Sequence, residues 1–219
     1  MKKYKILVFG ILFLGACANG QVKKNENAFA VLPKPELNEK VATFAGGCFW
    51  SLSEGLSELN GVDKVVAGYA GGTVKNPTYE DVCSDNTGHA ESVQIYYDPK
   101  VISYTQLAEA FFYAHDPTTL NRQGPDEGED YRSVAFYRTP EEEKTLKDIV
   151  EKVNKSHHYA DPVVTQIVPF KVIYPAENYH QGYYKTHPGS SYIQNVSVPK
   201  VMKLRASMNA YLKPEFKKK

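Results

Sequence analysis

The order of apolar and polar positions along the chain predicts strands that alternate with helices. Residues 41–45 form an apolar run that ends in two glycines, and Leu52, Leu56 and Leu59 follow at the spacing of one helical face. Residues 93–97 alternate between the two sides, as a half-buried strand does. The first half of the folded region is therefore expected to contain a strand, a helix and further strands.

Helix-capping residues locate two more helices. Ser103 with Gln106 forms a capping box, and Thr139 precedes Pro140 and a run of glutamates. Further strands are predicted over residues 62–69, 132–138 and 162–170, and a last helix over residues 200–212. Because strands and helices interleave, the predicted fold class is α+β, with helices packed on a mixed sheet in one domain of residues 41–212.

The two ends of the chain lie outside this domain. Residues 1–17 join a lysine-rich start, an apolar run too short to cross a bilayer and small residues before Cys17. This pattern resembles a bacterial lipoprotein signal peptide in which Cys17 is lipidated; the alternative is an ordinary cleaved signal with a chance cysteine. Either interpretation predicts export. Residues 18–40 are expected to form a flexible tether, and residues 213–219 a basic tail.

Composition narrows the classes of function. The 219 residues carry 26 Lys and Arg against 25 Asp and Glu, a formal net charge of +1, so nucleic acid is not the expected partner. The 42% of hydrophobic and 23% of charged residues are typical of a globular chain. The cysteines Cys17, Cys48 and Cys83 contain no C-x-x-C pair, which argues against a zinc ribbon and a thioredoxin-type redox pair.

Cys48 is the first candidate for chemistry. It follows Gly46 and Gly47 at the end of a predicted strand, so the turn delivers its thiol to a helix N-terminus, where an anion is favoured. The thiol is therefore expected to ionise more readily than a free one. Phe49 and Trp50 supply an apolar wall beside the sulfur. The alternative is that Cys48 is a small buried apolar residue without a chemical role.

Three polar residues could serve this thiol if the fold brings them close. Glu91, held near a thiolate in an apolar site, would have its pKa raised by desolvation and could deliver a proton. Tyr79 and Tyr131 could donate hydrogen bonds to an oxygen that develops negative charge. Taken singly, each has an ordinary alternative, since tyrosines in loops cover surfaces and a glutamate before a strand is usually solvated.

Six sequence blocks in a fixed order carry a resemblance to a known family. They are Gly46-Gly47-Cys48-Phe49-Trp50, Gly68-Tyr69-Ala70-Gly71-Gly72, Asn76-Pro77-Thr78-Tyr79, Gly88-His89-Ala90-Glu91, His115-Asp116-Pro117 and Asp130-Tyr131-Arg132-Ser133. Together they resemble the A-type peptide methionine sulfoxide reductases over residues 41 to 187. The resemblance implies reduction of the S epimer of methionine sulfoxide, free or in oxidised proteins. The enzyme is expected to be a monomer.

The resemblance also implies a role for each matching residue. Cys48 would attack the sulfoxide sulfur and be left as a sulfenic acid, which thiols reduce. Glu91 would protonate the sulfoxide oxygen, and Tyr79 and Tyr131 would hydrogen-bond to it. Asp126 matches a further polar position of the site.

Further implications concern the substrate pocket, the fold and the histidines. Phe49 and Trp50 would enclose the S-methyl group of the substrate, and the fold would be a ferredoxin-like two-layer sandwich. No metal or bound cofactor is expected. His157, His158 and His180 lack a ligand constellation and are interpreted as surface or structural residues.

The chain departs from the family pattern in two places. Ser51 and Ser53 stand where many members carry Gly and Glu, and Glu54 is one position out of register, so a changed helix surface is expected. Resolving cysteines in a C-terminal tail are usual in the family, whereas no cysteine follows Cys83 here. An outside thiol, either a thioredoxin-like protein or a small dithiol, is therefore expected to reduce Cys48, with Cys83 as the alternative.

Two other functions compete with this interpretation. A thiol hydrolase would use His89 or His180 as a base and would need no reductant. A non-catalytic surface lipoprotein would use Cys48 only for packing. The chain is expected to be exported and lipid-anchored at a bacterial cell envelope, on the periplasmic side or at the outer membrane.

Overall fold

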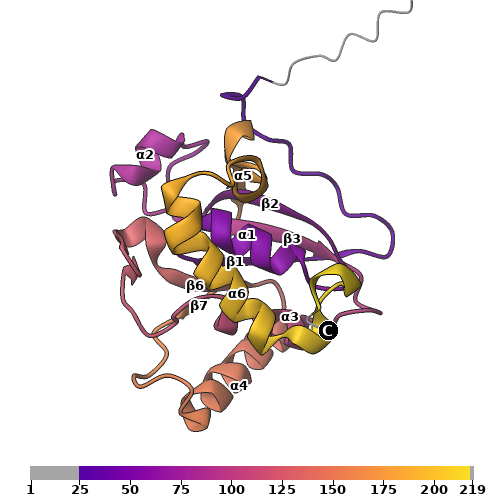
Figure 1. Cartoon of the computed structure of the whole chain (residues 1–219). Coiled ribbons are helices and arrows are strands. Elements are labelled where there is room, and N and C mark those ends of the chain that lie inside the picture. The colour runs from indigo at the N-terminus through magenta and orange to yellow at the C-terminus, as the bar shows by residue number, and fades with distance from the viewer. Residues whose placement is uncertain (1–24, 218–219) are drawn as a thin grey trace, which may run out of the picture.

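A six-stranded sheet with helices on one face forms the frame of the molecule (Figure 1). The computed structural model describes residues 25–217, so the predicted signal peptide, Cys17 and the last two lysines lie outside the described residues. The strands of the sheet are β1 (Lys40–Gly46), β2 (Val62–Ala70), β3 (Ala90–Tyr97), β6 (Ser133–Tyr137), β7 (Gln166–Pro169) and β8 (Ile173–Pro175).

Six α-helices and several short turns complete the described chain. The helices are α1 (Phe49–Ser57), α2 (Tyr79–Cys83), α3 (Tyr104–Ala114), α4 (Pro140–Ser156), α5 (Tyr183–Thr186) and α6 (Val198–Ser207). The short elements are β4 (Arg122–Gln123), β5 (Asp126–Glu127), the 3₁₀ turns Glu129–Tyr131, Asn178–His180, Asn209–Tyr211 and Pro214–Phe216, and the π-turn Ile193–Ser197. Within residues 25–217, no helix is both long and apolar enough to span a membrane.

The strand order β7-β6-β1-β3-β2-β8 makes the sheet mixed, because β6 and β7 run parallel while the other neighbours are antiparallel. The predicted α+β class with helices packed on a mixed sheet is therefore confirmed. The ferredoxin-like detail stays a prediction.

Local sequence sets several element boundaries. The capping box of α3 is formed, since the Gln106 amide donates to Ser103 Oγ at 3.2 Å and the Ser103 amide donates to Gln106 Oε1 at 2.8 Å. α4 begins at Pro140, as predicted. The last helix was predicted over residues 200–212. It begins earlier, at Val198, because the π-turn Ile193–Ser197 leads directly into α6, and it ends at Ser207.

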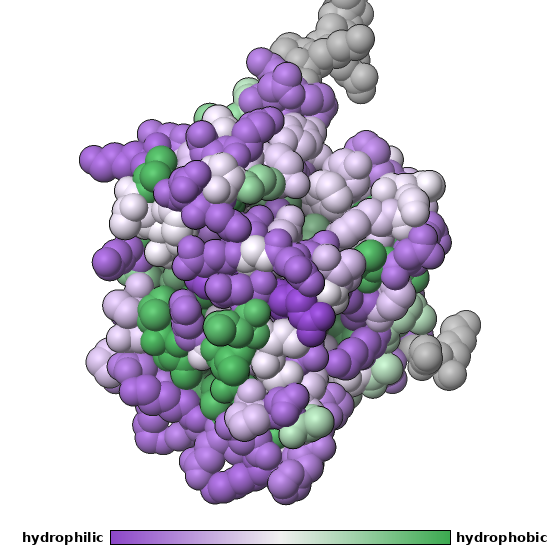
Figure 2. Space-filling model, turned by 90° about the vertical axis from the view of Figure 1, so that its left-hand side faces the viewer, coloured by the Kyte–Doolittle hydropathy of each residue, from purple (hydrophilic) through white to green (hydrophobic). Residues whose placement is uncertain are grey.

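The two faces of the sheet are covered differently. On one face α1, α3, α4 and α6 enclose the main core, in which the rings of Phe44 and Phe111 stack with their centroids 4.6 Å apart. The other face carries the small residues Ala45, Ala70 and Ala90 and a lesser apolar cluster. Figure 2 shows apolar residues gathered on the side of the molecule that lies to the left in Figure 1.

Part of the segment that is predicted as a tether contacts the domain. The Ala30 amide donates to the Ala176 carbonyl at 2.9 Å, and the Asn178 amide donates to the Ala28 carbonyl at 2.8 Å. The Tyr96 hydroxyl donates to the Pro33 carbonyl at 2.8 Å. Residues 26–30 thus run along the loop that follows β8, and Pro33 lies against Tyr96 of β3.

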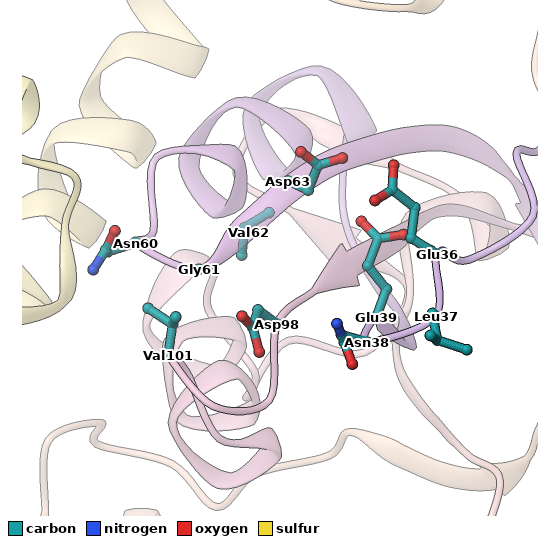
Figure 3. Close-up of a pocket in the computed structure, with 10 residues that line it drawn as sticks. All are labelled: Glu36, Leu37, Asn38, Glu39, Asn60, Gly61, Val62, Asp63, Asp98 and Val101. Carbon is teal, nitrogen blue, oxygen red and sulfur yellow. The ribbon is translucent and has the colours of Figure 1, made fainter.

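The antiparallel pairing of β1 and β3 places different residues at the two ends of these strands. β1 ends where β3 begins, since Ala45 lies opposite Ser92, so Cys48 and Glu91 meet at that end. A cavity of about 510 Å³ lies at the other end, between the residues before β1 and Asp98 after β3 (Figure 3). Its acidic lining, Glu36, Glu39, Asp63 and Asp98, is remote from the cysteine.

Candidate functional site

A glycine turn delivers Cys48 to the start of α1. Gly47 has φ +77°, and a Cβ at this position would lie 2.4 Å from the Cγ of Gln123, so only glycine fits. Cys48 is the N-cap residue of α1 and leaves only 6% of its surface exposed. The predicted strand, turn and helix around the thiol are all present.

The first amides of α1 bind both Glu91 and the sulfur. Glu91 lies near the start of β3, and its Oε2 accepts a hydrogen bond of 2.9 Å from the Phe49 amide. The Trp50 amide hydrogen-bonds to Cys48, and Cys48 itself hydrogen-bonds to Glu91. Two amides that a helix start leaves unpaired therefore hold the carboxyl group and the thiol side by side.

Burial controls the ionisation of this pair. Desolvation raises the pKa of Glu91 to about 8, which the charges of Asp130 and Asp126 reinforce and the Phe49 amide opposes. The predicted rise of this carboxyl pKa is therefore confirmed. Glu91 keeps its proton below about pH 8 and can donate it there.

The prediction of a readily ionised thiol is wrong for the protein at rest. Burial raises the pKa of Cys48 well above its ordinary value, and the charge of Glu91 raises it further. Hydrogen bonds from Tyr192 and from the Trp50 amide lower this pKa but do not offset burial. The helix N-terminus is thus outweighed by desolvation and by a neighbouring carboxylate.

Tyr79 and Tyr131 both lie close to this pair. Burial is the largest cause that raises the pKa of each phenol, and the charge of Glu91 raises both. The Tyr79 amide donates to Glu177 Oε1 at 3.0 Å, which fixes the start of α2. The phenol of Tyr79 also hydrogen-bonds to Cys83, one turn further along α2. The two predicted phenol donors are thus brought to the predicted acid.

Asp126 reaches the site together with a tyrosine that the sequence did not single out. The Tyr192 hydroxyl donates to Asp126 Oδ2 at 2.6 Å and also hydrogen-bonds to Cys48. Lys200 Nζ lies 3.5 Å from the same carboxylate oxygen. Tyr192 comes just before the π-turn at the start of the last helix, where no periodic pattern marks it.

Aromatic rings enclose the other side of the sulfur. Phe49 is fully buried with its centroid 4.8 Å from that of His180, and the Trp50 indole stacks on Tyr183 at 3.8 Å. His180 is therefore buried within the site and is not a surface residue. His157 and His158 are exposed, which agrees with their interpretation as surface residues.

The helix positions that depart from the family pattern are partly internal. Ser51 is buried and its hydroxyl donates to Ser197 Oγ at 3.0 Å, so the expected change of the helix surface is wrong at this position. Glu54 is also buried and lies 3.5 Å from Lys185, and burial raises its pKa to about 7. These residues join α1 to the C-terminal elements.

The arrangement suits transfer of an oxygen atom to sulfur under acid assistance. A protonated carboxyl group, two phenols and a thiol converge in a site walled by aromatic rings. Within the described part of the chain, no three His, Cys, Asp or Glu side chains lie close enough to hold a metal ion. His89 does not serve as a base here, because both of its ring nitrogens are engaged in hydrogen bonds, Nδ1 with the Gly72 amide and Nε2 with the Val74 carbonyl.

Comparison with known proteins identifies relatives over most of the chain. The sequence model of the family described as peptide methionine sulfoxide reductase matches residues 40–212. The chain is 49% identical over 175 residues to a peptide methionine sulfoxide reductase MsrA of Polynucleobacter asymbioticus, covering 80% of this chain and 92% of the relative. A relative of the same name from Leptospira borgpetersenii is 48% identical over 178 residues, covering 81% and 96%.

Solved structures agree with the sequence relatives. The reduced form of Mxr1 from Saccharomyces cerevisiae superposes with a TM-score of 0.67 at 35% identity, covering 72% of this chain and 91% of that one. Methionine sulfoxide reductase A of Corynebacterium diphtheriae gives a TM-score of 0.67 at 28% identity, covering 75% and 90%.

The coupling between Cys48 and Glu91 predicts how alkylation depends on pH. In Glu91→Gln the negative charge that opposes thiolate formation is absent, so Cys48 should react with iodoacetamide at lower pH than in the wild type. Peptide mass spectrometry across a pH series measures this, with the alkylation of an added small thiol as the reference. An unchanged or higher onset for Cys48 would show that the carboxylate does not keep this thiol protonated.

Proposed function

The chain belongs to the peptide methionine sulfoxide reductase family, as an enzyme of the A type, and on that premise we propose how it acts. Cys48 attacks the sulfur of the S epimer of methionine sulfoxide, free or within an oxidised protein. The S-methyl group lies against Phe49 and Trp50. The sulfoxide oxygen faces Glu91, Tyr79 and Tyr131.

The proposed reaction balances in two steps. Attack of Cys48 forms a bond between its Sγ and the sulfoxide sulfur. The oxygen then passes to Sγ as this bond and the sulfur–oxygen bond of the substrate both break, which leaves a sulfenic acid on Cys48 and releases methionine. Two equivalents of an outside thiol then reduce the sulfenic acid, forming one disulfide and one water molecule and restoring the Cys48 thiol.

One observation carries this proposal: the acid that holds its proton at neutral pH lies against the buried sulfur. Glu91 has a pKa of about 8 and hydrogen-bonds with Cys48. A sulfoxide becomes a good electrophile when its oxygen is protonated or strongly hydrogen-bonded. As Glu91 gives its proton to that oxygen it can take the proton of Cys48, so the nucleophile and the electrophile are activated together.

The outside thiol is a thioredoxin-like protein or a small dithiol in this proposal. Cys83 is exposed at the end of α2, and its thiol is engaged with Tyr79. Attack of Cys83 on Cys48 would break that contact and move a phenol out of the site. External reduction therefore disturbs the site less.

Envelope attachment is proposed from the sequence alone. Residues 1–17 carry the features of a lipoprotein signal, with Cys17 as the lipidated residue. The enzyme would then act on the exported side of a membrane, held by its lipid and not by a spanning helix.

Separate turnover of the two sulfoxide epimers tests the activity. With dithiothreitol, the wild type should consume only the S epimer of a blocked methionine sulfoxide, and Cys48→Ala should consume neither. Glu91→Gln should lower the rate about a hundredfold or more, since general acid catalysis contributes on this scale. The wild-type rate should fall as pH rises through about 8, where Glu91 loses its proton. Turnover of neither epimer by folded wild type would refute the activity.

Intact-mass analysis tests the reductant. After one equivalent of sulfoxide without thiol, the mass should rise by one oxygen atom, as expected for a sulfenic acid. Cys83→Ser should show the same mass and keep its turnover with dithiothreitol. A stable disulfide between Cys48 and Cys83 would overturn the preference for an outside thiol.

Metabolic labelling with a fatty acid tests the anchor. The full chain expressed in a bacterium should incorporate label and sediment with membranes, whereas Cys17→Ala should lose the label. Cys83→Ala serves as the matched control, since it removes a cysteine outside the signal. Label retained in Cys17→Ala would contradict lipidation at this residue.

A further inference from the structure

His180 lies at the centre of the site without taking part in the proposed chemistry. Its side chain is fully buried in the 3₁₀ turn that follows β8. The rings of Phe49, Tyr79 and Tyr179 surround it, with centroids 4.8, 4.7 and 4.0 Å from that of the imidazole. A polar ring therefore occupies a position that an apolar residue of similar size could fill.

One nitrogen of this imidazole binds the tryptophan. The Trp50 Nε1–H donates to His180 Nδ1 at 3.1 Å. Burial lowers the pKa of His180 to about 4, so the ring is neutral near pH 7. A neutral imidazole that accepts at Nδ1 carries its proton on Nε2, which assigns the tautomer.

The other nitrogen, although buried, has no hydrogen-bond partner among the described residues. The nearest carboxylate oxygen, Oε2 of Glu177, lies 3.9 Å away and already accepts from the Tyr69 hydroxyl at 2.9 Å. A buried donor without a partner destabilises the fold, and a leucine would avoid that cost. The hydrogen bond that Nδ1 accepts from Trp50 therefore explains why a histidine occupies this position.

The indole needs this hydrogen bond because its other contacts leave the ring free to rotate in its own plane. Stacking on Tyr183 at 3.8 Å and 11° fixes the plane of the ring, and the edge of Tyr192 approaches at 5.6 Å. Stacked rings can still turn within their common plane. The hydrogen bond to His180 is directional and fixes that rotation.

The turn that carries His180 is itself held from outside the site. The Asn178 amide donates to the Ala28 carbonyl at 2.8 Å, and the Tyr179 amide donates to the Glu26 carbonyl at 3.1 Å. The Asn178 side chain donates to the Asn25 carbonyl at 2.9 Å. The acceptor for the indole thus sits on a turn that the N-terminal segment supports.

We propose that His180 is a positioning residue of the reductase: its Nδ1 fixes the orientation of the Trp50 indole, and thereby the wall against which the substrate methyl group packs. This inference rests on the proposed function, in which Trp50 lines the substrate pocket. His180 acts through Trp50 and does not touch the reacting atoms.

The test compares variants that keep or remove the acceptor. In His180→Asn the amide oxygen can take the place of Nδ1, whereas His180→Leu and His180→Gln place no acceptor there. Turnover of the S epimer with dithiothreitol gives kcat and KM, and thermal unfolding monitors the fold. Trp50 is the single tryptophan of the chain, so intrinsic fluorescence reports directly on its indole. Each substitution is also made in Trp50→Phe, which has no indole N–H.

Removal of the acceptor should lower kcat/KM about tenfold, the effect of losing one hydrogen bond of ordinary strength. His180→Leu and His180→Gln should also change the tryptophan emission, whereas His180→Asn should retain both the rate, within about threefold, and the emission. In the Trp50→Phe background, the same substitutions should lower the rate by less than about twofold.

Two results would overturn the inference. One is equal rates and emission for the Asn and Gln variants, which remain comparable even if the Leu variant does not fold. The other is a loss of rate on His180→Gln that is as large in Trp50→Phe as in the wild type, since the two residues would then act independently. Absence of turnover in the wild type would instead refute the proposed function.

Discussion

The hydrogen bond from the Phe49 amide to Glu91 joins the two halves of the site. Cys48 follows the end of β1 and Glu91 lies near the start of β3, and these strands are neighbours that run in opposite directions. The start of α1 therefore faces the carboxyl group through a hydrogen bond of 2.9 Å. Any shift in register between β1 and β3 would separate the acid from the sulfur.

Burial of this contact determines the character of the site. If the carboxyl group and the thiol were both exposed, each would keep its ordinary pKa, and the carboxyl group would have no proton to donate at neutral pH. Here desolvation is the largest cause of the rise for both groups. The donors around them, the two amides of α1 and the Tyr192 hydroxyl, limit that rise without reversing it.

Local sequence predicted the parts of the fold whose causes are local. The capping box at Ser103 depends on neighbours a few positions away, the turn before Cys48 depends on the positive φ that glycine permits, and both are present. The contacts that His180 and Tyr192 make in the site could not be found in this way. His180 contacts Trp50 across 130 positions, and Tyr192 contacts Asp126 across 66, and neither residue belongs to a periodic run. The ionisation of Cys48 was predicted with the wrong sign because a local pattern shows the helix start but not the burial that outweighs it.

A thiol that is protonated at rest is compatible with the proposed attack of Cys48 on sulfur. Thiolates are the reactive form towards oxidants and alkylating agents, so a permanently ionised Cys48 would be exposed to side reactions between turnovers. In the proposed reaction, the sulfoxide oxygen supplies the missing proton acceptor, and the proton of Cys48 replaces the one that Glu91 gives up. Negative charge thus forms on the Cys48 sulfur only as this sulfur bonds to the substrate, within a site from which aromatic side chains exclude water. In this proposal the raised pKa values of Cys48 and Glu91 act together, because they delay ionisation until the substrate is in place.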